Sequence, residues 1–98
     1  MDQFLEQWDI DIDDASKDKI DLYKALQEKL KEQPESVELY WRLVQAALAL
    51  ASSHEKVGNK TDGKKYTEEA HHYAKSAIEF GPNSLQAHKW QVWVSIWI

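Results

Sequence analysis

A chain of 98 residues is too short for more than one domain, and its 43% hydrophobic and 30% charged residues are typical of a folded globular protein. The absence of cysteine excludes disulfides, thiolate zinc sites and cysteine nucleophiles. Residues 1–21 hold eight acidic residues against two lysines, whereas the remainder, with ten basic and nine acidic residues, is nearly neutral. This distribution argues against general nucleic-acid binding, which needs a basic face.

The first 15 residues show little helical periodicity. Their large apolar side chains would suit a single amphipathic turn: Phe4, Leu5 and Trp8. We therefore interpret residues 1–15 as an acidic N-terminal arm, either free or docked on the domain, and residues 16–98 as the helical domain.

The acidic run that starts at Asp9 begins like a calcium-binding loop. Asp14 stands where such a loop needs glycine, and Ile20 stands where it needs a bidentate glutamate. We interpret the run as a solvated arm, with Ile10 and Ile12 packing on the domain.

The first predicted helix starts after Asp14 or Ser16, either of which can cap it, and stops at Pro34. Its apolar side chains recur at three- and four-residue steps, at Ile20, Tyr23, Leu26 and Leu30.

A second helix follows from Val37 to Ala51 and is apolar on most sides, so we expect it to lie between two neighbours. Residues 54–65 contain Gly58 and Gly63 and lack apolar periodicity, which predicts a long loop.

A third helix is predicted over residues 66–78, ended by Gly81 in a left-handed cap and by Pro82. Asn83 or Ser84 caps a fourth helix that runs from Leu85 to the end. The expected fold is all-α, with about four helices and no strand.

A weak internal repeat supports pairing of these helices. Residues 34–38 match residues 82–86 at an offset of 48, and Ala70, Ala77 and Pro82 have the relative spacing of the small-residue and proline positions in a tetratricopeptide repeat. Small residues let antiparallel helices approach closely. We therefore expect antiparallel helix pairs of tetratricopeptide-like type, with a period longer than that family's 34 residues.

Three segments, 38–43 with Trp-Arg-Leu, the alanine-rich 66–77, and 88–90 with His-Lys-Trp, resemble signatures of the regulator-of-microtubule-dynamics family over residues 20–90. The resemblance implies a tetratricopeptide-like array, association with microtubules and the spindle, and no enzymatic activity. We expect no cofactor. Some relatives bind lipids or tether proteins at organelle membranes instead.

Family members of this type continue for more helix pairs, so we expect a truncated array that self-associates through its last helix. Three tryptophans form a stripe on that helix and are its candidate interface: Trp90, Trp93 and Trp97. The candidate microtubule contacts are four lysines of the predicted loop, because tubulin presents an acidic surface: Lys56, Lys60, Lys64 and Lys65. The alternative is an ordinary solvated loop.

Other prominent side chains receive structural roles. We expect Trp41 in the core, Arg42 paired with an acid on the first or third helix, and His88 in an interhelix hydrogen bond. The neighbours His71 and His72 point about 100° apart, so we expect no metal site there. No set of residues suggests catalysis.

We therefore predict a non-catalytic, microtubule-associated interaction module at the cytoskeleton and spindle, acting in microtubule dynamics and chromosome segregation. The start of the chain lacks a secretory signal and the apolar residues 90–98 are too few to span a membrane, which favours the cytoplasm. One alternative is a peptide- or lipid-binding scaffold at an organelle surface, which for lipid predicts a deep apolar cavity. Another is a dimerisation domain.

Overall fold

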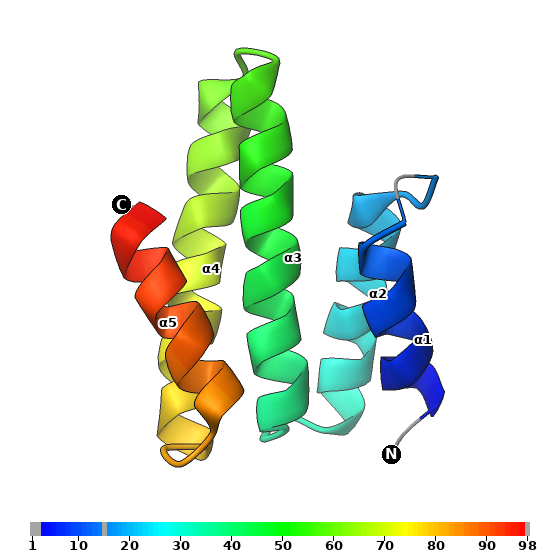
Figure 1. The fold of residues 1–98 in the computed structure, drawn as a ribbon, viewed down its shortest axis with the longest axis vertical. Coiled ribbons are helices and arrows are strands. Elements are labelled where there is room, and N and C mark those ends of the chain that lie inside the picture. The colour runs from blue at the N-terminus through cyan, green and yellow to red at the C-terminus, as the bar shows by residue number, and fades with distance from the viewer. Residues whose placement is uncertain (1–2, 15, 98) are drawn as a thin grey trace.

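The computed structural model describes residues 3–14 and 16–97, and within them it contains five α-helices and no strand (Figure 1). The helices are α1 Gln3–Ile12, α2 Lys19–Glu32, α3 Val37–Lys56, α4 Lys60–Phe80 and α5 Leu85–Trp97. The predicted all-α class is confirmed. The additional helix is α1, in the segment for which the sequence indicated a single turn.

The α1 helix is a docked element and not a solvated arm. Leu5, Trp8 and Ile12 lie on one face at three- and four-residue steps and are all buried, whereas Ile10 is 64% exposed, against our expectation. Acidic residues occupy much of the opposite face. Because of them the segment is acidic in overall composition, which makes its short apolar stripe hard to recognise from the sequence.

The turn from α1 into α2 is closed by side chains. Asp18 caps α2 by accepting a hydrogen bond from the backbone N–H of Ile20, so the predicted caps at Asp14 and Ser16 are wrong. Asp14 instead accepts hydrogen bonds from the backbone and hydroxyl of Ser16. The ammonium of Lys19 donates to the carbonyl of Ile12 at 2.6 Å, which ties the start of α2 to the end of α1.

The predicted loop over residues 54–65 is wrong, because α3 and α4 form a hairpin whose connection is only residues 57–59. Gly58 adopts a φ of +81°, which glycine accepts without steric cost, and Asn59 caps α4. Gly63 lies inside α4 against α3, where a Cβ would approach the Cγ of Glu55 to 3.1 Å. This glycine marks a close approach of two helices.

The two proline-containing turns have the same capping geometry. Ser36 accepts a hydrogen bond from the N–H of Leu39 at 3.3 Å, and Ser84 accepts one from Ala87 at 3.2 Å. Gly81 ends α4 with a φ of −138°, so the predicted left-handed cap is wrong. A Cβ there would meet the side chain of Val37, which explains why a residue without one is needed.

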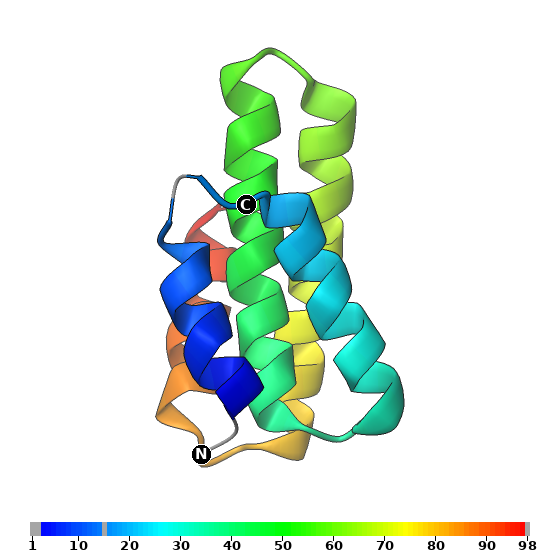
Figure 2. The same ribbon diagram turned by 90° about the vertical axis from the view of Figure 1, so that its right-hand side faces the viewer.

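The α3 helix lies at the centre, with α1 and α5 on one side and α2 and α4 on the other (Figure 2). Its most extensive contact is with α4, and buried residues cover nearly its whole circumference. This alternation is compatible with tetratricopeptide-like pairing. The α3–α4 hairpin extends beyond the other helices at the top of Figure 1.

No helix in the described part of the chain is both long enough and apolar enough to cross a membrane.

Candidate functional site

Four lysines gather at the projecting end of the α3–α4 hairpin, and we call them the basic tip: Lys56, Lys60, Lys64 and Lys65. Their side chains are exposed. Among the described residues, none of them takes part in an ion pair.

The helix ends at the tip contribute little net field, since the C-terminus of α3 and the N-terminus of α4 carry opposite ends of the helix dipole. Residues 54–65 contain two acidic residues, Glu55 and Asp62. The carboxylate of Asp62 accepts a hydrogen bond from the capping Asn59 at 2.8 Å. The lysines are therefore the source of positive potential.

The tryptophan stripe of α5 is described only in part. Trp90 is half-buried against the core, with the ammonium of Lys89 5.3 Å from its ring centroid. Its indole N–H is buried without a partner among the described residues. The side chains of Trp93 and Trp97 lie outside the described part of the chain.

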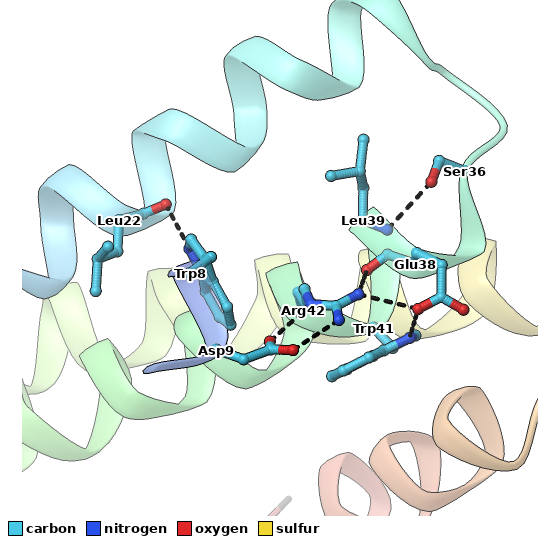
Figure 3. Close-up of polar contacts among 8 residues, drawn as sticks. All are labelled: Trp8, Asp9, Leu22, Ser36, Glu38, Leu39, Trp41 and Arg42. Carbon is cyan, nitrogen blue, oxygen red and sulfur yellow. Dashed lines mark hydrogen bonds and ion pairs between the residues drawn. The ribbon is translucent and has the colours of Figure 1, made fainter. Parts of the chain in front are cut away.

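Arg42 joins α1 to α3, and this contact was not foreseen (Figure 3). Its guanidinium donates to both carboxylate oxygens of Asp9 at 2.8 Å, and to the carboxylate and backbone carbonyl of Glu38 at 3.0 and 2.9 Å. The expected partner on the first or third predicted helix is wrong. The i,i+4 spacing of Glu38 and Arg42 was the signal available for one of the two partners.

The surroundings of Arg42 stabilise the positive charge of its guanidinium. The residue is 3% exposed, and its guanidinium stacks 4.1 Å from the ring of Trp41, whose own N–H donates to Glu38 at 3.2 Å. Burial alone would lower the pKa of Arg42, but hydrogen bonds to Asp9 and then Glu38 raise it. Asp9, the first residue of the calcium-like run, is thus engaged as a structural partner.

A second polar link joins α2 to α4. The hydroxyl of Tyr23 donates to Glu69 at 2.6 Å, and Gln27 donates to the hydroxyl of Tyr73 at 3.2 Å. Burial, reinforced by the bond to Glu69, raises the pKa of Tyr23. This tyrosine is a neutral core donor without catalytic geometry around it.

The remaining residues singled out in the sequence lie as follows. Trp41 is 8% exposed, and Ala70 and Ala77 are fully buried on α4. His88 is exposed, and its ring nitrogen Nε2 forms a hydrogen bond with the carbonyl of Pro82 in the turn before α5, so the expected interhelix hydrogen bond is wrong. Among the described residues, no group of three or more histidines, aspartates or glutamates is placed to hold a metal.

Open grooves lie in the described part of the surface. One of about 470 Å³ lies between α4 and α5 and is lined by His71, His72, Ala74, Lys75, Ile78, Gln91 and Val94. Two smaller ones of about 350 and 380 Å³ adjoin between α1 and α2 and share Phe4 and Ala25.

Residues 4–94 match the family model of regulator of microtubule dynamics protein 1-3. The chain belongs to this family. No curated protein and no solved structure matches it. Membership relates the chain to microtubule dynamics. The matched segment runs from α1 into α5 and includes the ion pair between Asp9 and Arg42.

Proposed function

We propose that the chain is a non-catalytic interaction module that contacts microtubules through the basic tip, and that it acts at the spindle in chromosome segregation. The observation that carries the contact is the convergence of four exposed lysines, none in an ion pair with a described residue, at the end of a projecting hairpin in a member of a microtubule-regulator family.

The physical basis of the contact is local charge. The chain has a net charge of −5, so the attraction to an acidic surface must come from the tip and not from the whole molecule. Contacts of this kind raise the association rate and weaken with salt. The expected binding is therefore modest in affinity and salt-dependent.

The test is cosedimentation with stabilised microtubules over a salt series, using tubulin with and without its acidic tails. Changing the four tip lysines to alanine should weaken binding by at least about tenfold, because each removes a charge from the contact. Alanine favours helix, so the fold should persist.

A matched variant changes four exposed lysines elsewhere to alanine: Lys17, Lys24, Lys31 and Lys89. It has the same net charge as the tip variant. An equal loss of microtubule binding in both variants would show that only the total charge matters. If the folded wild-type chain does not pellet with microtubules, the direct contact is excluded.

A lipid-binding role at an organelle surface would need an enclosed apolar cavity. The grooves described above are open and bordered by polar residues, so they give this alternative no support.

A further inference from the structure

The two ends of the helical layer carry grooves that differ in charge. In Figure 1 the α1–α2 pair forms the right-hand end and the α4–α5 pair the left-hand end. The basic tip belongs to neither groove, so any role of the grooves is independent of the microtubule contact.

The α4–α5 groove carries one positive charge, that of Lys75, at its border. Its apolar floor is formed by Ala74, Ile78 and Val94, and its border carries Lys75 with His71 and His72. Among the described residues that line it, none is acidic.

The α1–α2 end is acidic. Asp11, Glu28 and Glu32 line its two grooves against a single basic residue, Lys29, among the described residues. The carboxylates of Glu28 and Glu32 are 72% and 68% exposed, so they remain accessible despite i,i+3 pairs with lysines of the same helix.

The acidic residues of α2 form a ridge. Ala25, Glu28 and Glu32 recur at three- and four-residue steps and so share one face, with Asp21 one turn earlier. Packed helices place the ridge of one element in the groove of the other. A ridge with a small residue at Ala25 and two flanking carboxylates complements a groove with an apolar floor and a basic border.

We propose that copies of this chain associate head to tail, with the α2 ridge of one copy seated in the α4–α5 groove of the next. The ridge brings Glu28 and Glu32 to Lys75, and the neighbouring α5 helix enters the groove between α1 and α2. Because the two surfaces differ, the contact is heterologous, and each added copy offers a new end for growth.

The size of the molecule limits the strength of this contact. The end faces lie across the 36 and 21 Å extents of the molecule, which allows at most about the 800 Å² per partner of a standard interface. With a charged border and a small apolar centre, assembly should be weak, concentration-dependent and reduced by salt.

The test is sedimentation velocity of the full chain over a concentration series at low and high salt. We expect species larger than a dimer at low salt. Lys75→Glu or Glu28→Lys alone should weaken assembly by at least about tenfold, because each creates a like-charge contact at every junction.

Mixing the two charge-reversed chains supplies the decisive measurement. The groove of the Lys75→Glu chain is then acidic and can receive the ridge of the Glu28→Lys chain, which is basic. The other junction, in which the unchanged ridge meets the unchanged groove, is that of the wild type, so alternating assembly should return.

Two substitutions outside the grooves are the matched controls, Lys17→Glu and Glu35→Lys. Both positions are exposed and line neither groove, and each substitution changes the net charge as its test variant does. The control chains should assemble as the wild type does.

Circular dichroism establishes that each variant is folded. A chain that stays monomeric, or that stops at a dimer, would overturn the proposal. So would assembly that survives either reversal, or folded variants that fail to assemble when mixed.

Discussion

The ion pair between Asp9 and Arg42 links α1 to α3. We expect Asp9→Ala to lower the free energy of unfolding by about 2 kcal/mol. Removing one partner of a buried ion pair typically costs about 3–5 kcal/mol, because the other charge is left buried. Two features reduce this figure. The carboxylate of Asp9 is 41% exposed, so solvent screens it, and Glu38 continues to accept hydrogen bonds from Arg42.

Urea denaturation followed by circular dichroism measures this change, and Arg42→Met provides the control background. Methionine keeps much of the apolar volume but removes the charge, so Asp9→Ala should cost little there. Glu38→Ala should cost less than about 1 kcal/mol in the wild-type background, since its side chain is 60% exposed.

This reasoning is refuted if Asp9→Ala lowers the free energy of unfolding equally in the wild-type and the Arg42→Met backgrounds. The ion pair would then contribute nothing, and docking of α1 would rest on its buried apolar face alone.

Three further changes test other contacts. Trp8→Phe should lower the free energy of unfolding by about 2 kcal/mol, because it removes the indole N–H that donates to a backbone carbonyl of α2 at 3.1 Å. Trp90→Phe should lower it by less than about 1 kcal/mol, since the indole N–H of Trp90 has no partner among the described residues. Urea denaturation measures both changes, and a larger loss for Trp90→Phe than for Trp8→Phe would contradict this. The pKa of Tyr23 is raised in the folded state above its ordinary value near 10, so its contribution to stability is present below that pH and is lost as pH rises beyond it. Denaturation at increasing alkaline pH should show this fall, and Tyr23→Phe should reduce its steepness; an unchanged slope would refute the assignment. Gly81→Ala should destabilise by about 1–3 kcal/mol, because its Cβ would lie 2.5 Å from a methyl group of the stiff Val37 side chain, and an unchanged melting temperature would show that the turn relaxes freely.

Helix starts with a hydroxyl cap were predictable from the sequence. Ser36 and Ser84 each precede an apolar run and follow a proline turn, and each caps the helix that begins at the next residue. The same logic placed the start of α2 too early, because Asp14, Ser16 and Asp18 offer equivalent chemistry and only the geometry of the α1–α2 turn selects Asp18.

The hairpin of α3 and α4 was not predictable by the same rules. Glycine at 58 and 63 suggests a loop, but only Gly58 leaves the helical region, whereas Gly63 remains helical where the two helices approach closely. Local propensity was overridden by tertiary packing. The four lysines named from the sequence nevertheless lie together, because the turn folds the end of α3 back on the start of α4.

The contacts between distant segments could not be foreseen from one sequence. Asp9 and Arg42 are 33 residues apart, and nothing in their neighbourhoods signals that α1 contacts α3. The two end grooves likewise arise from the order in which five helices pack, which periodicity does not determine.

The unequal lengths of the helices have a consequence for the reach of the tip's electric field. With 20 residues, α3 is six longer than α2, which has 14, and six residues of helix extend about 9 Å. At physiological ionic strength the Debye length is about 8 Å, so this overhang places the end of the hairpin, with Lys56 and Lys60, about one screening length beyond the acidic α1–α2 turn. An approaching anionic surface therefore meets the positive charge before it senses the negative remainder of the molecule.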